Sequence, residues 1–189
     1  SPYFRFPIDD SRQSGFLWPS IGHDSDGGTE VTIPYYFNLR PHLDATYILS
    51  SIWKRGVMHE GELRHLNKYG KNLLAGTFLP SDNEYNEDEL ITSTNTSGFD
   101  KQDRWLTHFS HKGKAGRLSS SVNYTSVSDI DYLDDLGGFK NTNSEFGSVA
   151  DNSREPALKR TGNISYTTKF WETTLELQNF QEISERKSN

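Results

Sequence analysis

Apolar and polar residues alternate with a period of two along much of the chain. In residues 29–37, Val31, Ile33, Tyr35 and Phe37 occupy one set of alternate positions, and residues 30, 32, 34 and 36 occupy the other. Because successive side chains of a β-strand point to opposite faces of a sheet, this pattern predicts a strand with one apolar face. Similar alternation marks four further clear segments, which are residues 104–110, 116–124, 158–166 and 171–178.

Weaker alternation marks four more candidate strands, at residues 15–22, 44–54, 57–66 and 72–79. The lengths of the nine predicted strands approach the roughly 9–11 residues that a tilted strand needs to cross a bilayer. From the fourth connection on, short links alternate with long polar links at residues 80–103 and 127–157. Outer-membrane barrels have short periplasmic turns and long external loops. The chain is therefore predicted to be all-β, an antiparallel transmembrane β-barrel segment whose first strand runs outward.

An odd number of strands predicts that the barrel extends beyond this chain. Bacterial single-chain barrels close with an even number of strands, and unpaired strand edges are costly in lipid. We therefore expect the nine strands to be part of a larger barrel. An isolated piece of this kind is expected to aggregate through its free edges.

The composition fits this prediction better than it fits an ordinary soluble domain. Only 32% of the residues are hydrophobic, yet 13% are aromatic. A barrel strand needs an apolar side chain only at every second position, which explains a low hydrophobic content with many aromatic residues. A net charge of -6 argues against a nucleic-acid partner, which requires a basic face. The absence of cysteine excludes disulfides within the chain.

A series of short motifs occurs in a characteristic order and spacing. The motifs lie at residues 2–4, 7–10, 12–20, 30–38, 41–46, 54–56, 61–64, 78–82, 103–105 and 123–129. In this order they resemble the LptD family of Gram-negative bacteria. Each motif alone is unspecific, whereas the ordered series is specific. The resemblance weakens after about residue 139.

The resemblance implies a non-enzymatic transport protein of the bacterial outer membrane, without a cofactor. It implies insertion of lipopolysaccharide into the outer leaflet through a barrel with a lateral gate. Residues 1–12 would be the junction from a periplasmic β-jellyroll domain, and residues 13–189 the N-terminal part of the barrel. The implied partners are lipopolysaccharide, an LptE-like plug lipoprotein, an LptA-like periplasmic bridge reached through the jellyroll, the barrel-assembly machinery and outer-membrane lipid.

Two prolines inside predicted strands are the leading candidate site. Pro19 and Pro34 each remove a hydrogen-bond donor, and proline is normally found only at sheet edges, strand starts or bulges. On the residues alone, they fit strand ends or a bulge as well as a loosened seam. The resemblance implies that they weaken the pairing of the first and last strands of the barrel, where lipid leaves. The candidate lateral-gate residues are Pro19, Pro34, Gly15, Phe16, Trp18 and Tyr35.

Polar positions on the later strands form a second candidate site, the lining of a wet lumen that passes sugars. They are Ser119, Ser121, Asn123, Thr161, Asn163, Glu172 and Glu176. The same residues also fit the solvated face of a soluble sheet. A short helix is expected over residues 128–136, with Ser128 as its candidate N-cap. The neighbouring carboxylates Asp134 and Asp135 are only a weak match to a glycosidase pair, and the scattered histidines do not indicate a metal site.

Two other classes of protein share parts of this pattern. A general outer-membrane porin or receptor has the alternation but lacks the ordered motifs. A soluble all-β module that binds carbohydrate through its aromatic residues also fits the composition. Solubility without detergent would favour the soluble module. Passive conductance without lipopolysaccharide binding would favour the porin.

Overall fold

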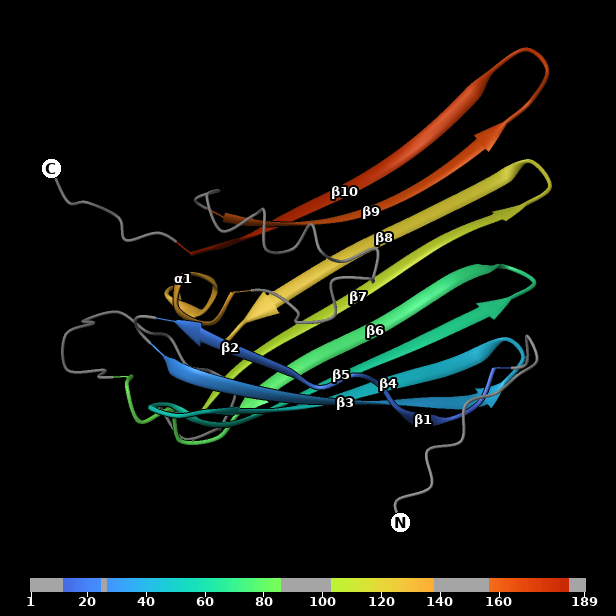
Figure 1. The fold of residues 1–189 in the computed structure, drawn as a ribbon. Helices are drawn as coiled ribbons and strands as arrows, with labels where there is room; N and C mark the ends of the chain where they lie inside the picture. Colours follow the sequence, from blue (N-terminus) through green and yellow to red (C-terminus); the bar gives the residue numbers. More distant parts are fainter. Residues whose placement is uncertain (1–11, 25–26, 86–102, 138–156, 184–189) are drawn as a thin grey trace, which may run out of the picture.

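The computed structural model describes residues 12–24, 27–85, 103–137 and 157–183, and these form one antiparallel sheet (Figure 1). Its elements are β1 (Gly15–Phe16), β2 (Ser20–Asp24), β3 (Gly28–Arg40), β4 (Leu43–Ile52), β5 (Gly56–Asn67), β6 (Gly70–Leu79), β7 (Arg104–Ala115), β8 (Leu118–Val127), α1 (Tyr132–Leu136), β9 (Ala157–Thr167) and β10 (Glu172–Glu182). Apart from residue 12, the predicted junction at residues 1–12 lies outside the described residues.

From β3 onward, each strand pairs with the next strand in sequence, which is the simplest antiparallel order. The order is β1-β3-β4-β5-β6-β7-β8-β9-β10, and β2 pairs with β3 beside β1. This confirms the predicted fold class, an antiparallel segment of a β-barrel. Nine strands were expected and the described ranges contain ten, because the first predicted strand, residues 15–22, is divided into β1 and β2.

The two faces of the sheet reverse the burial expected of a soluble protein, because polar side chains are buried on one face and apolar side chains are exposed on the other. On β4, the polar residues Thr46 and Ser50 are 5% and 1% exposed, whereas Tyr47 between them is 38% exposed. On β5, Glu60 and Glu62 are buried while Leu63 is exposed. A continuous apolar surface on a soluble monomer is unusual, and it normally marks contact with a membrane or a partner. The apolar face is therefore the outer face, and the polar face is the inner face.

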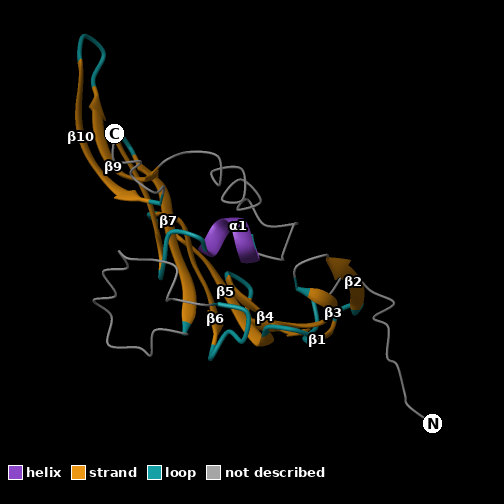
Figure 2. Cartoon of the chain, turned by 90° about the vertical axis from the view of Figure 1, so that its left-hand side faces the viewer, coloured by secondary structure: helices purple, strands orange, loops and turns teal. Residues whose placement is uncertain are grey.

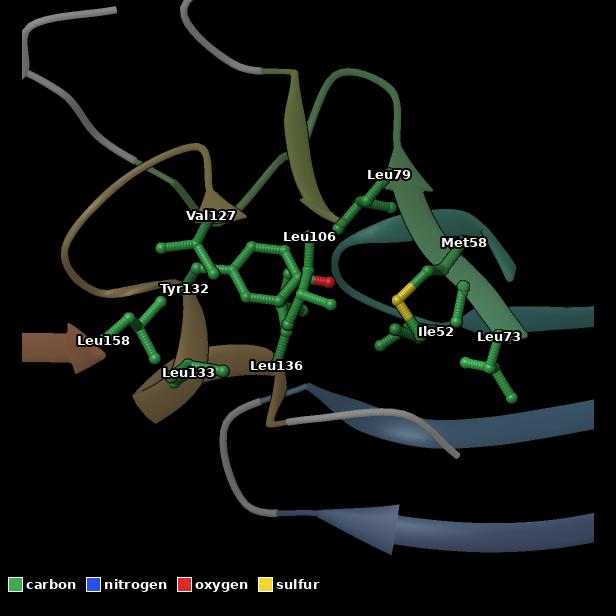
Figure 3. Packing of buried hydrophobic residues seen from close by; sticks show 11 residues of the cluster. Ile52, Met58, Leu73, Leu79, Leu106, Val127, Tyr132, Leu133, Leu136 and Leu158 are labelled. Carbon is green, nitrogen blue, oxygen red and sulfur yellow. The ribbon is translucent and has the colours of Figure 1, made fainter. Parts of the chain in front are cut away.

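The sheet curves around its inner face, and α1 lies within the curve (Figure 2). The hydroxyl groups of Tyr132 on α1 and Thr77 on β6 hydrogen-bond, which fixes the helix on that face. A cluster of buried apolar side chains packs beneath it (Figure 3). The cluster contains Ile52, Met58, Leu73, Ala75, Leu79, Leu106, Val127, Tyr132, Leu133, Leu136 and Leu158. Within the four described ranges, no helix is long and apolar enough to cross a membrane.

Candidate functional site

The first predicted strand is interrupted by a β-bulge at the edge of the sheet. Phe16 of β1 pairs with Tyr35, and Ser20 of β2 pairs with Thr32. Three edge residues, 17–19, thus lie opposite only two residues of β3, at positions 33 and 34. One extra residue on one strand defines a bulge, which leaves that residue unpaired and bends the strand. Both prolines singled out from the sequence lie at this bulge.

The proline on β3 directs its missing donor toward the edge rather than into the sheet. The carbonyl oxygen of Pro34 accepts a hydrogen bond of 2.9 Å from the backbone N–H of Leu17. The nitrogen and oxygen of a strand residue point to the same neighbouring strand. The donor that Pro34 lacks is therefore lost from the pairing with β1 and β2, and the pairing of β3 with β4 continues past it.

Aromatic contacts on the outer face help to hold the short strand β1. The ring of Phe16 meets that of Tyr35 edge-on, with 4.9 Å between the ring centroids, and Tyr35 lies 4.6 Å from Phe37. Phe16 and Trp18 are nevertheless 75% and 85% exposed. Gly15 pairs with Tyr36 and has open space around its Cα. The structure thus brings all six candidate gate residues together at one edge.

Polar contacts tie the start of this edge to the inner strands. The side chain of Ser14 accepts a 2.8 Å hydrogen bond from the backbone N–H of Asn38. Arg12 pairs with Asp44 on β4 at 3.4 Å, and Asp44 also pairs with Arg64 on β5 at 2.6 Å. Arg12 is largely exposed, so its ion pair contributes at most about 1 kcal/mol. The edge is held by short and individually weak contacts.

The seven predicted lumen residues lie on one face of the sheet. The register pairs Ser121 with Asn163 and Asn163 with Glu176, and Asn123 with Thr161. Ser119 and Glu172 have the same parity on their strands, so they share this face. Following the register across β7 and β6 leads to Thr77, which contacts α1. The seven residues are therefore on the inner face, and their role in passing sugars stays a prediction.

A buried ion cluster beside α1 was not predicted. The guanidinium of Arg104 binds both oxygens of Asp129 at 2.7 and 3.0 Å, and it also binds Asp82 at 3.1 Å. Arg55 pairs with the same oxygen of Asp82 at 2.8 Å. Arg104 and Asp82 are only 1% and 0% exposed. The cluster joins three connections of the sheet, because Arg55 comes from the β4–β5 turn, Asp82 and Arg104 from the β6–β7 link and the start of β7, and Asp129 from the link after β8.

The helix adds one more carboxylate to this cluster. Asp135 accepts a 2.6 Å hydrogen bond from Arg104 and lies 3.6 Å from Arg55. The rings of Tyr85 and Tyr132 lie 4.5 and 5.7 Å from the Arg104 guanidinium. Burial raises the pKa of the Tyr132 phenol, which hydrogen-bonds Thr77. Asp135 thus has a structural role as an ion-pair partner, whereas its neighbour Asp134 is exposed.

The helix is shorter than the sequence predicted, and its cap is different. Helix α1 covers Tyr132–Leu136 and its N-cap is Asp131, which makes no side-chain capping bond. Ser128 is not the N-cap. Its hydroxyl accepts the backbone N–H of Trp105 at 3.1 Å and donates to Asp129. Ser128 therefore belongs to the ion cluster rather than to the helix start.

Sequence reasoning missed this cluster because its members are far apart in the chain. One signal was available, since Tyr132, Leu133 and Leu136 place apolar side chains at helical spacing inside an otherwise polar link. Such spacing in a loop indicates a helix that packs back on the protein. The charged residues that surround the helix could be identified only from the pairing register of the strands.

The fold and its faces define a class of protein, the transmembrane β-barrel segment with an apolar outer face and a polar inner face. The family model described as "LptD: LPS transport system D" matches residues 102–189. The LPS-assembly protein LptD of Vibrio vulnificus strain YJ016 is 32% identical over 183 residues, which are 96% of this chain and 20% of that protein.

Two further relatives cover the whole chain. The LPS-assembly protein LptD of Psychrobacter arcticus is 34% identical over 189 residues, covering 100% of this chain and 18% of that protein. The LPS-assembly protein LptD of Pectobacterium atrosepticum is 37% identical over 190 residues, which cover 100% of this chain and 22% of that protein. By these matches the chain belongs to the LptD family. It spans about a fifth of the length of the curated relatives it matches.

Proposed function

We propose that this chain is part of a barrel that inserts lipopolysaccharide into the outer leaflet of the bacterial outer membrane. The names of its relatives refer to LPS assembly, which supports the substrate class. In this proposal the β1–β2 edge is one side of a lateral gate, and the protein carries out transport without chemistry. The observation that carries the proposal is the bulge opposite Pro34 at the edge of the sheet.

This edge separates more easily than an ordinary pair of strands. In lipid, an unsatisfied backbone group costs several kcal/mol, so barrel strands normally stay fully paired. A bulge leaves one residue unpaired in both the closed and the open state, and proline has no N–H to lose. Separating β1 and β2 from β3 therefore breaks fewer hydrogen bonds than separating two fully paired strands of this sheet.

The inner face supports the second half of the proposal, a polar route for the sugar part of the lipid. The face that carries Asn123, Thr161 and Glu176 offers hydrogen-bond donors and acceptors across three adjacent strands. The acyl chains would leave through the gate into the bilayer. The proposed partners are an LptE-like plug, an LptA-like bridge through a preceding jellyroll, and the barrel-assembly machinery during folding.

The test restores the two missing donors in the full-length protein. We expect Pro19→Ala combined with Pro34→Ala to tighten the edge and to reduce the delivery of lipopolysaccharide to the cell surface, at an unchanged amount of inserted barrel. Pro41→Ala is the matched control, because Pro41 lies in the turn between β3 and β4, away from the bulge. Equal surface lipopolysaccharide in the double variant and the control would contradict the gate.

A further inference from the structure

The two ends of the sheet carry opposite charge. The four short turns with their flanking residues, at positions 40–42, 67–71, 112–117 and 167–172, form what we call the short-turn rim, which lies together at the right of Figure 1. It contains seven lysines and arginines and a single carboxylate, Glu172. All seven cations are exposed; they are Arg40, Lys68, Lys71, Lys112, Lys114, Arg117 and Lys169.

The opposite end has the reverse composition. The described link residues 53–55, 80–85, 103–104 and 128–137 contain seven carboxylates and three cations. Those cations include Arg55 and Arg104, whose charges are paired with carboxylates in the buried ion cluster. Among the described residues of these two ends, positive charge is therefore concentrated on the short-turn rim, in a chain whose net charge is -6.

Close packing of two turns crowds these cations together. Lys71 on β6 pairs directly with Lys112 on β7, and Gly70 pairs with Gly113. A Cβ on Gly113 would lie 2.2 Å from the Tyr69 carbonyl oxygen, so the two backbones meet where no side chain fits. Like charges directly opposite each other on neighbouring strands are destabilising. Lys112 pairs in turn with Ser121, so this lysine pair adds positive charge to the inner-face side of the rim.

Aromatic side chains accompany the cations and continue the apolar outer face. The ammonium of Lys68 lies 4.7 Å from the ring centroid of Tyr69, and that of Lys169 lies 5.8 Å from Phe170. Trp171 packs at 5.7 Å from Tyr166 on the outer face. Phe170 is 87% exposed. Aromatic rings beside long cationic side chains, at the border of an apolar surface, are typical of the headgroup region of a membrane.

We propose that the short-turn rim docks on anionic phospholipid headgroups, in the leaflet that faces the short turns. The inference rests on the proposed function in one respect, which is that the chain spans a bilayer with its short turns on the periplasmic side. Lysines close to an anionic lipid surface attract it within about a Debye length. Lys68 and Lys169 lie beside the turn aromatics Tyr69 and Phe170, at the border of the lipid-facing surface. A headgroup reaches these two lysines while its acyl chains contact the apolar strands, whereas Lys71, Lys112 and Lys114 lie on the inner-face side of the rim.

The experiment measures which lipid lies at the rim of the full-length protein. The protein is placed in nanodiscs of phosphatidylcholine with a minority of phosphatidylglycerol, carries a photoreactive residue at Phe170, and is analysed for crosslinked lipid by mass spectrometry. We expect a severalfold enrichment of phosphatidylglycerol over its bulk share. A second probe at Leu175, which is exposed on the outer face, reports insertion itself.

Neutralising the rim separates charge attraction from simple proximity. Lys68→Gln with Lys169→Gln is expected to bring the phosphatidylglycerol share at Phe170 close to the bulk value, as is raised salt. Lys54→Gln with Lys159→Gln removes two charges away from this rim and should leave the enrichment intact.

Three results would overturn the inference. One is a bulk lipid ratio at Phe170 of the wild type despite lipid crosslinks at Leu175, which leaves the membrane placement standing. Another is preferential crosslinking of added lipopolysaccharide over phosphatidylglycerol at Phe170, which would assign the rim to the transported glycolipid. Absence of lipid at both probes would instead refute the membrane placement, and the rim proposal with it.

Discussion

The inner face beside α1 and the β1–β2 edge are held together in different ways. Beside α1, the strands pair without interruption and Arg104 binds three carboxylates, while Leu79 and Leu106 are fully buried. At the edge, β1 pairs with β3 over only two residues, and a bulge separates it from β2. Phe16 and Trp18 there are mostly exposed.

This difference teaches where the sheet can move. A buried cluster with satisfied charges is costly to disturb, because removal of one partner leaves another charge buried and unpaired. Short pairing, missing donors and exposed side chains are features of regions that open locally with little free energy. The sequence therefore combines a fixed body at α1 with a separable edge, which a lateral gate requires.

The largest expected effect comes from breaking the fixed body. Arg104→Ala leaves Asp129 buried without the guanidinium that binds both its oxygens, and leaves Asp82 paired with Arg55 alone. The free energy of unfolding should therefore fall by about 3–5 kcal/mol. Denaturant unfolding of the full-length protein in detergent measures this change. Arg117→Ala, at an exposed turn, should change it by no more than about 0.5 kcal/mol. Equal stability of the two variants would show that the cluster is not what holds this end together.

A smaller effect is expected where the helix joins the cluster. Asp135→Asn removes the charge that Arg104 binds at 2.6 Å. Because Asp135 is partly exposed, we expect a loss of about 1 kcal/mol and about fivefold faster hydrogen exchange in α1. The reporting amides are those of Asp135 and Gly137, which donate to Asp131 and Leu133. Asp134→Asn changes an exposed neighbour, and the helix should then exchange as in the wild type.

An effect no larger than about 1.5 kcal/mol is expected at the edge, where little holds the strand. Phe16→Ala removes one edge-on aromatic contact, which contributes about 0.5–1.5 kcal/mol. The amide of Leu17, which donates to Pro34, should exchange several times faster. Phe109→Ala removes a ring from the same outer face, far from the edge, and should not affect Leu17. Unchanged hydrogen exchange of Leu17 in both variants would show that the Phe16–Tyr35 contact does not stabilise the edge.

Local alternation was sufficient to predict the body of the fold. The segment 29–37 falls within β3 and the segment 158–166 within β9, since side-chain parity is a property of neighbouring residues. The inner-face positions followed for the same reason. The sequence also showed that Pro19 and Pro34 interrupt the predicted strands. The alternation of side chains could not show that residues 17–19 lie opposite only residues 33 and 34.

The ion cluster could not be predicted because it depends on long-range register. Arg55, Asp82 and Arg104 lie in separate connections, and only the pairing of β4 through β8 brings them together. The helix was predicted four residues too early, at Ser128, because serine is a common N-cap. In the fold, the Ser128 hydroxyl instead accepts a hydrogen bond from the backbone N–H of Trp105 and donates one to Asp129.

The central claim, that lipid crosses at the β1–β2 edge, is tested most directly by photocrosslinking in living cells. Probes at Phe16, Trp18 and Tyr35 of the full-length protein are compared with a probe at Thr107. Thr107 is exposed on the same face and lies in the register row of Tyr35, through Tyr47, Gly61 and Gly76. We predict strong crosslinks to lipopolysaccharide at the three edge positions and weak ones at Thr107. An inserted protein with equal or stronger crosslinking at Thr107 would contradict a gate at this edge.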